Sequence, residues 1–107
     1  MLYIFCFTEG IYRFFIHMKG LFRNVVIIND LGLHARAAAK VSRIAQDAAA
    51  NVWMMKDGER VDAANILDIL TLAGTKGSKI RIEIEDPSDV KILDQMVSLI
   101  KDGFGEQ

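Results

Sequence analysis

Strand-like alternation of apolar and polar residues recurs along the chain from Phe22 onward. It is clearest in 79-KIRIEIE-85, where an isoleucine occupies every second position and charged residues lie between them. In a β-strand these two sets point to opposite faces, so the isoleucines should face a core and the charged residues water. Runs rich in β-branched and apolar residues predict three further strands, at 23–28, 52–56 and 60–62. The pair Asp57-Gly58 predicts a tight hairpin between the last two.

Three other segments carry apolar residues at the three- and four-residue spacing of a helix. The first, over residues 35–48, is dominated by alanine. The second is expected to end at Gly74 or Gly77, and the third to begin at 86-DPS-88 and end at Gly103. The three apolar stripes are Ala38, Val41, Ala45 and Ala48; Ile66, Ile69, Leu70 and Ala73; and Val90, Leu93, Val97 and Ile100.

The resulting order, β-α-β-β-α-β-α, predicts the fold class. Helices that cross between strands of one antiparallel sheet should pack on the same face of it. We therefore expect an α/β (α+β) two-layer open-faced sandwich, a four-stranded antiparallel sheet covered on one face by three helices. The other face should meet solvent. A chain of 107 residues has room for one such core, which we place in a single domain over residues 18–107.

Apolar side chains on the uncovered sheet face are unusual. By alternation Trp53 and Met55 should point to that face, and Val26 and Ile28 are expected to lie beside them. Together they would form an apolar patch suited to a dimer contact. The alternative is that residues 1–17 fold over this patch.

Residues 1–17, MLYIFCFTEGIYRFFIH, are apolar and aromatic but follow no regular pattern. They lack the basic segment and the cleavage site of a signal peptide, and they are shorter than the ~20 residues that span a bilayer. We interpret them as an extension upstream of a start at Met18. A membrane-surface or partner-binding arm is the alternative, and His17 is given no role.

Charge and composition exclude several classes of function. Thirteen basic and fourteen acidic side chains nearly balance, so no nucleic-acid-binding surface is expected. One cysteine forms neither an internal disulfide nor a cysteine zinc site, and two histidines are too few for a histidine metal cluster. We therefore expect no metal or other cofactor, no membrane span and a reducing, cytoplasmic location.

The strongest chemical signal is 31-LGLHARAAAK-40, at the start of the first helix. Gly32 permits a tight turn, and His34 falls at or next to the N-cap. The first backbone N–H groups of a helix have no intrahelical acceptor, and with the helix dipole they form a site for an anion. Arg36 adds a donor suited to phosphate oxygens, although a cation in the first turn opposes the dipole. The backbone donors belong to Ala35, Arg36 and Ala37.

Beside an anion site, the nitrogen lone pair of a neutral imidazole is suited to nucleophilic attack on phosphorus. Hydrolysis fits less well, because no second histidine or convergent carboxylate lies nearby in sequence to activate water. Asp30 is more simply a solvated loop carboxylate than a group that orients the ring. From these arguments alone, the alternative is that His34 is an ordinary polar surface residue.

The same residues resemble the histidine-containing phosphocarrier (HPr) family of the bacterial phosphotransferase system. The resemblance spans roughly residues 22–106 and rests on 29-NDLGLHARAAAK-40, 57-DGERVDAANILDILTLAGTKGSKI-80 and 102-DGFGE-106. It implies a relay in which enzyme I, charged by phosphoenolpyruvate, phosphorylates His34 on Nδ1. The phosphoryl group, stabilised by Arg36, would pass to an EIIA-type acceptor. Such a protein is a carrier with a covalent phosphohistidine intermediate rather than a stand-alone enzyme.

Two positions depart from the commonest family pattern. A proline usually follows the His-Ala-Arg motif in this family, and this chain has Ala37 at that position. With the residues before it, this alanine looks more like the nitrogen-related branch of the family than the sugar-transport branch. Asn65 replaces the regulatory serine at the start of the second helix, so it can cap that helix but offers no hydroxyl for phosphorylation. Ser78 and Ser88 are not equivalent sites.

The resemblance also implies that partners dock on the active loop and on the exposed side of the second helix. We expect Leu67 and Thr71 to be contact residues there, whereas Ile66 and Leu70 belong to the core stripe. The alternative function is a regulator of the same fold that binds targets without transferring phosphate. Retention of His34 and the nearby arginine, together with loss of the serine, favours the carrier.

Overall fold

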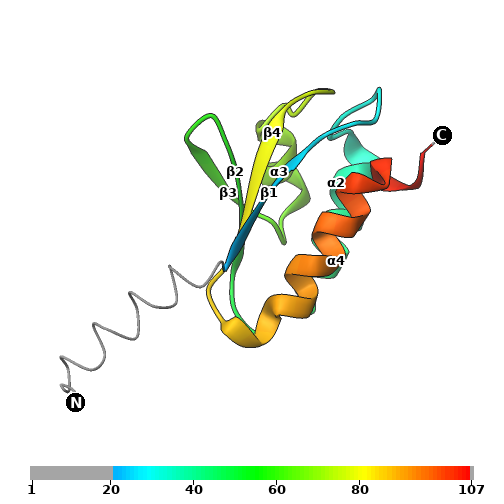
Figure 1. Cartoon of the computed structure of the whole chain (residues 1–107). Coiled ribbons are helices and arrows are strands. Elements are labelled where there is room, and N and C mark those ends of the chain that lie inside the picture. Colours follow the sequence, from blue (N-terminus) through cyan, green and yellow to red (C-terminus); the bar gives the residue numbers. More distant parts are fainter. Residues whose placement is uncertain (1–20, 107) are drawn as a thin grey trace, which may run out of the picture.

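The computed structural model describes residues 21–106, over which strands and helices follow the predicted order (Figure 1). The elements are β1 (Phe22–Val26), α2 (Ala35–Gln46), β2 (Val52–Lys56), β3 (Glu59–Asp62), α3 (Ile66–Thr71), β4 (Lys79–Ile84), the 3-10 turn η1 (Pro87–Asp89), α4 (Val90–Lys101) and the 3-10 turn η2 (Gly103–Gly105). The extension expected over residues 1–17, with the start at Met18, lies outside the described residues.

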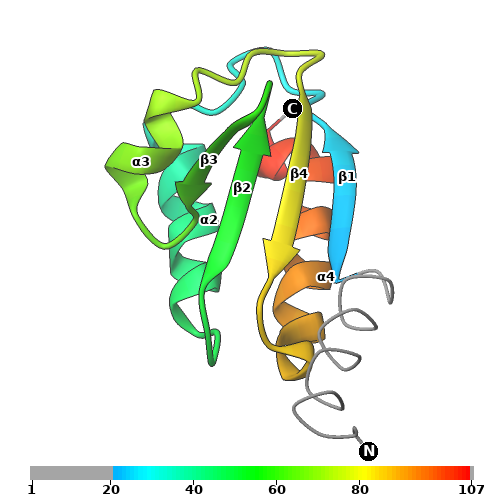
Figure 2. The same ribbon diagram turned by 90° about the vertical axis from the view of Figure 1, so that its left-hand side faces the viewer.

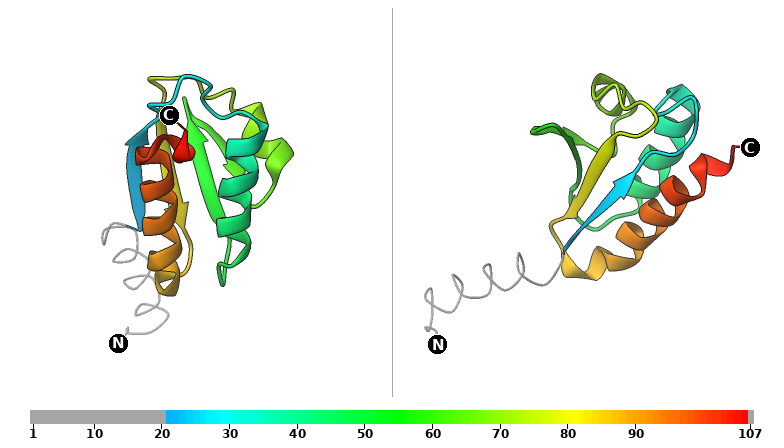
Figure 3. Two further views of the ribbon diagram at one scale, coloured as in Figure 1. Left: turned by 90° about the vertical axis from the view of Figure 1, so that its right-hand side faces the viewer. Right: turned by 45° about the horizontal axis from the view of Figure 1, so that its top comes forward.

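The four described strands form one antiparallel sheet in the order β1-β4-β2-β3. Figure 2 shows this sheet in front with the helices behind it, and Figure 3 shows α2 and α4 side by side on the covered face. The short α3 packs against α2 and lies beside β3. This arrangement is the predicted open-faced sandwich, so the fold class is confirmed.

Strand boundaries differ from the predicted ones by one or two residues. β1 ends at Val26, so Ile28, expected on its outer face, follows the strand and is 52% exposed. At the predicted hairpin, Asp57 and Gly58 have φ values of 52° and 83°. Two successive positive φ values are the geometry of a tight two-residue turn between antiparallel strands, as the sequence predicted.

The core lies between the sheet and the helices, and the predicted alternation accounts for the contribution of β4. Ile80, Ile82 and Ile84 are buried, and the charged residues between them are more exposed. Complete burial of one such side chain stabilises a fold by about 1.5–3 kcal/mol. From the helices the core takes Ala37, Ala38, Val41 and Ala45 of α2, Ile69 of α3, and Leu93, Met96 and Ile100 of α4.

Three residues assigned to the helical stripes are exposed instead: Ile66 and Val90, 39% each, and Ala73. Ala73 follows the end of α3 at Thr71, so it is not on the buried face of that helix. Ile66 and Val90 are each the first residue of their helix. Because side chains on a helix lean toward its N-terminus, a first residue directs its side chain past the packed part of the helix. The expected burial of Ile66 is therefore wrong, and Leu70 is only partly buried against the core.

Helix α3 ends earlier than predicted, and a different residue ends it. Its last residue is Thr71, and Ala73 adopts the left-handed φ of 51° that glycine usually supplies. Gly74 is buried, and a Cβ on it would lie 2.8 Å from side-chain carbons of Ile27 and Leu33. Gly74 is therefore required by close packing rather than by the end of the helix.

The apolar patch expected on the uncovered face is not formed, because β4 lies between β1 and β2. The outer residues of β4 are charged: Lys79 lies opposite Val26, and Arg81 lies opposite Met55. Trp53 is covered in part by the guanidinium of Arg60, 3.9 Å from its ring centroid. The prediction of a continuous dimer patch is therefore wrong, since it assumed that β1 and β2 are neighbours.

Candidate functional site

The loop that carries His34 is fixed by a close approach to the segment after α3. Gly32 has a φ of 63°, and a Cβ there would lie 2.3 Å from the carbonyl oxygen of Gly74. The next residue, Leu33, donates its backbone N–H to the same carbonyl at 2.8 Å. Only glycine fits this position without strain, as the sequence indicated.

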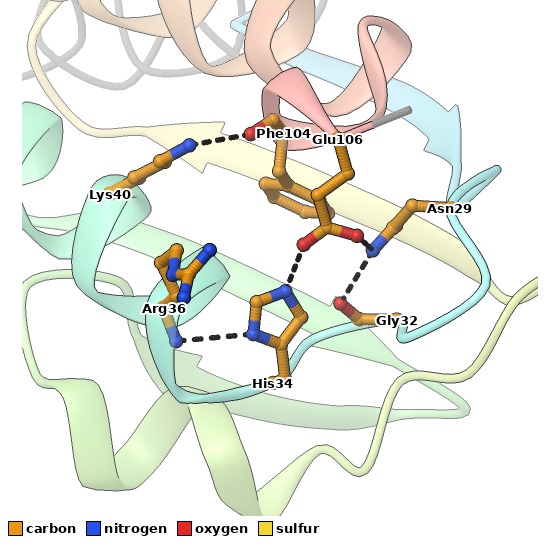
Figure 4. Close-up of polar contacts among 7 residues, drawn as sticks. All are labelled: Asn29, Gly32, His34, Arg36, Lys40, Phe104 and Glu106. Carbon is orange, nitrogen blue, oxygen red and sulfur yellow. Dashed lines mark hydrogen bonds and ion pairs between the residues drawn. The ribbon is translucent and has the colours of Figure 1, made fainter.

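His34 is the N-cap of α2, as predicted. Its Nδ1 accepts a hydrogen bond from the backbone N–H of Arg36 at 3.2 Å (Figure 4). Its carbonyl oxygen accepts the N–H of Ala38 at 2.9 Å. A backbone N–H only donates, so Nδ1 carries no proton in this arrangement. The lone pair of Nδ1 therefore faces the partially positive end of the helix.

The other ring nitrogen of His34 contacts a residue that the sequence did not suggest. Nε2 is hydrogen-bonded to the carboxylate of Glu106, and the amide Nδ2 of Asn29 donates to the second carboxylate oxygen at 3.0 Å (Figure 4). The same Nδ2 donates to the carbonyl of Gly32 at 3.0 Å. An ionised carboxylate only accepts, so the ring proton lies on Nε2.

The C-terminal turn η2 brings Glu106 to this site. Phe104 is fully buried with a φ of 60°, and its carbonyl accepts a 2.6 Å hydrogen bond from Nζ of Lys40 on α2. The hydrogen bond from Asn29, and after it that from His34, lowers the pKa of Glu106 below its usual range. The sequence signal for this turn was the pair of glycines around Phe104, which permit positive φ values.

The remaining predicted site residues lie in the first turn of α2. Arg36 is exposed, and among the described residues its guanidinium forms no hydrogen bond or ion pair. Ala35 is exposed and Ala37 is buried, and the position of their N–H groups in the first turn leaves them without intrahelical acceptors. An open hollow of about 840 Å³ lies beside the ring, lined by Ile28, Asn29, Leu31, His34, Ala35, Arg36 and Glu106 among others.

Asp30, interpreted from the sequence as a solvated loop carboxylate, is exposed and pairs with Lys76 at 2.8 Å between Oδ1 and Nζ. This hydrogen bond lowers the pKa of Asp30. Within residues 21–106 no group of three or more His, Cys, Asp or Glu side chains is placed to hold a metal ion. No helix in that range combines the length and the apolar character needed to cross a membrane.

The start of α3 has the capping geometry expected from the sequence. Oδ1 of Asn65 accepts the backbone N–H of Asp68 at 3.2 Å. Leu67 is 73% exposed, in agreement with its assignment to the surface. Thr71 is also exposed, and its hydroxyl donates to the carbonyl of Asp68 at 2.6 Å.

Comparisons with known proteins match this chain over the same region. The family model described as "PTS HPr component phosphorylation site" matches residues 22–102. The phosphocarrier protein HPr of Cupriavidus necator is 40% identical over 84 residues, which cover 78% of this chain and 94% of that protein. The phosphocarrier protein NPr of Klebsiella oxytoca is 35% identical over 85 residues, with the same coverage.

Solved structures give the same result. The crystal structure of HPr-C-His from Thermoanaerobacter tengcongensis superposes with a TM-score of 0.76 at 30% identity, over 80% of this chain and 97% of that one. The HPr of Bacillus anthracis superposes with a TM-score of 0.69, also at 30% identity, over 74% of this chain and 94% of that one. Because HPr and NPr proteins are both among the relatives, assignment to the nitrogen-related branch stays a prediction.

Proposed function

The chain belongs to the HPr family of phosphotransferase-system phosphocarriers, and from this membership we propose that His34 accepts a phosphoryl group from enzyme I. Enzyme I would be charged by phosphoenolpyruvate, and the acceptor from His34 would be an EIIA-type protein. The protein is then a carrier that is regenerated in each cycle, and it holds the phosphoryl group covalently between two partners.

The observation that carries this proposal is the placement of the His34 ring. Its Nδ1 lone pair faces the N-terminus of α2, 3.2 Å from the N–H of Arg36, and the proton is on Nε2. In the transfer step that lone pair attacks phosphorus and the Nδ1–P bond forms. The bond between phosphorus and the donor atom of enzyme I breaks, and its electron pair leaves with that atom.

The residues around Nδ1 are suited to hold the product. Once Nδ1 is bonded to phosphorus, the N–H of Arg36 loses its acceptor on the ring and can donate to a phosphoryl oxygen. The N–H groups of Ala35 and Ala37 lie in the same turn, where the helix dipole favours a negative charge. The exposed guanidinium of Arg36 can reach the same anion and form charge-assisted hydrogen bonds with it.

Partner proteins would approach the partly exposed ring and the neighbouring surface of α3. The side chain of His34 is 24% exposed, so an incoming phosphorus atom can reach it. Leu67 and Thr71 provide exposed contacts on α3, and Ile66, expected in the core, adds apolar surface at the start of that helix. Ile66 and Leu67 are adjacent in the sequence, and contiguous exposed apolar surface is what marks protein contact sites.

The alternative, a regulator that binds targets without transferring phosphate, needs no particular ring geometry. It is disfavoured because both ring nitrogens of His34 have partners that leave Nδ1 as the nucleophile. The two proposals differ in whether phosphate enters and leaves the chain.

The test is a two-stage transfer assay. The chain is incubated with phosphoenolpyruvate and catalytic enzyme I, and intact-mass measurement should show one added phosphoryl group of ~80 Da that is labile to acid and stable to alkali. Purified phosphoprotein mixed with an EIIA-type protein should then lose that mass as the acceptor gains it. Absence of the added mass would refute the carrier function, and a phosphate that is gained but never passed on would favour the regulator.

A further inference from the structure

We propose that Glu106 is a positioning residue for phosphoryl transfer, which holds the ring of His34 with its proton on Nε2 and its lone pair on Nδ1. The inference rests on the proposed function of His34 and adds to it a residue from the far end of the chain. Three features of the described residues support it: the hydrogen bonds of the carboxylate, the anchoring of the turn that presents it, and its charge.

The first feature is that both carboxylate oxygens of Glu106 are engaged. Oε2 contacts Nε2 of His34, and Oε1 accepts from Nδ2 of Asn29 at 3.0 Å. Asn29 is only 7% exposed, and its Nδ2 is held a second time by the carbonyl of Gly32. The carboxylate therefore has one orientation, which is set by a buried amide rather than by solvent.

The second feature is that the turn carrying Glu106 is fixed at three points. Phe104 is inserted into the core with no exposed surface, and Lys40 of α2 bonds the carbonyl of Phe104 at 2.6 Å. The backbone N–H of Glu106 itself donates to the carbonyl of Gly103 at 3.1 Å. The glutamate is thus presented by an anchored turn, in contact with the same helix whose N-terminus faces Nδ1.

The third feature is charge. When Nδ1 bonds to phosphorus while Nε2 keeps its proton, the ring gains positive charge, and an adjacent carboxylate stabilises it. In the onward step the Nδ1–P electron pair returns to Nδ1, and the ring becomes neutral again. The charged or titratable groups around the carboxylate are His34 and Lys40, and the hydrogen bond from Asn29 lowers the pKa of Glu106, which keeps it ionised near neutral pH.

Replacement of the carboxylate by an amide should disturb the ring proton. In Glu106→Gln the amide has one oxygen, and both Asn29 Nδ2 and His34 Nε2–H require an acceptor. If that oxygen faces Asn29, the amide NH2 faces Nε2 and favours the tautomer with the proton on Nδ1. A ring protonated on Nδ1 has lost both its bond to the N–H of Arg36 and its nucleophilic lone pair.

The experiment compares wild type, Glu106→Gln and Glu59→Gln. Glu59→Gln is matched in chemistry, because it removes one carboxylate from the β2–β3 hairpin, where Glu59 is exposed and has no side-chain bond to His34 or Asn29. Imidazole 15N chemical shifts of His34 at neutral pH give the tautomer populations in the free protein. Rates of phosphorylation by enzyme I and of transfer to an EIIA-type protein are measured on the same samples.

Wild type and Glu59→Gln should carry the proton on Nε2, and Glu106→Gln should populate the Nδ1-protonated tautomer. Transfer by Glu106→Gln should slow by roughly 10–100-fold, by analogy with the loss of a carboxylate that orients a metal-binding histidine. Either an unchanged tautomer or an unchanged transfer rate in Glu106→Gln overturns this inference. If the proposed carrier function is wrong, the result is different: the wild-type protein takes up no phosphate. The tautomer of His34 in the free protein can still be measured in that case.

Discussion

Nδ1 of His34 and the backbone N–H of Arg36 are joined by a 3.2 Å hydrogen bond, so one lone pair both caps α2 and faces the anion-binding end of that helix. The cap and the nucleophile are therefore the same atom. Phosphorylation would replace this bond with contacts from the helix N-terminus to phosphoryl oxygens, so the helix end has an acceptor in both states.

The two roles of His34 can be separated by substitution. His34→Asn should keep a side-chain acceptor at the N-cap, whereas His34→Ala should not, and both remove the imidazole and its contact with Glu106. We expect the asparagine variant to be more stable than the alanine variant by about 1 kcal/mol in urea denaturation. Neither should gain phosphate from enzyme I, and an added ~80 Da on either variant would contradict the assignment of His34.

Arg36→Ala should separate phosphate stabilisation from folding. The exposed cation in the first turn opposes the helix dipole, so its loss should leave the free energy of unfolding unchanged or raise it by up to about 0.5 kcal/mol. Transfer should slow by roughly tenfold or more, since a hydrogen bond to a charged group contributes about 1.5–3 kcal/mol.

Arg43→Ala is the control for Arg36→Ala, because Arg43 lies in the last turn of the same helix, where a cation favours the dipole. It should lower stability slightly and leave transfer unchanged. Equal transfer rates in wild type and Arg36→Ala would exclude the arginine from the phosphate site.

The fold class was predictable from local pattern, but the spatial order of strands was not. The alternation over residues 79–85 correctly predicted the buried isoleucines of β4, and Asp57-Gly58 correctly predicted the hairpin between β2 and β3. The pattern does not say which strands are neighbours, and insertion of β4 between β1 and β2 is what removed the expected patch around Trp53. The end of α3 was misjudged because Ala73 adopts a φ that propensity assigns to glycine.

Part of the candidate site was likewise predictable from local sequence, and part was not. His34, Gly32 and Arg36 lie within five residues, and helix-capping rules placed them correctly relative to one another. Glu106 lies 72 residues from His34, and it reaches the ring only because the core anchors Phe104 and α4 ends beside the loop. No local rule connects residues at that distance, so only the tertiary fold reveals the contact.

The lowered pKa of Glu106 predicts a pH dependence of stability. A carboxyl group whose pKa falls on folding stabilises the folded protein at pH values above its pKa in the unfolded chain, which for glutamate is near 4.5. This contribution is lost as the pH falls through the lower pKa of the folded state. The difference in unfolding free energy between wild type and Glu106→Gln should therefore shrink from about pH 6 to about pH 3. Urea denaturation across this range measures it, and a difference that is constant with pH would contradict the predicted coupling.

Asn65 predicts that an ATP-dependent HPr kinase will not phosphorylate this chain. Its amide oxygen caps α3 by accepting the N–H of Asp68, but it offers no hydroxyl. Asn65→Ser restores the hydroxyl with a cap of similar quality, so this variant should gain alkali-labile phosphate while wild type does not. A kinase-competent HPr serves as the positive control, and labelling of wild type at Ser78, Ser88 or another serine would contradict the prediction.

The central claim, that Nδ1 of His34 carries the phosphoryl group, is tested most directly by NMR of the phosphorylated protein. The chain is labelled with 15N, charged with phosphoenolpyruvate and enzyme I, and recorded at alkaline pH, where the P–N bond is stable. We predict one-bond phosphorus coupling to Nδ1 of His34, with Nε2 still coupled only to its ring protons. Coupling to Nε2, or phosphate on His17 or on any other residue, would contradict this account.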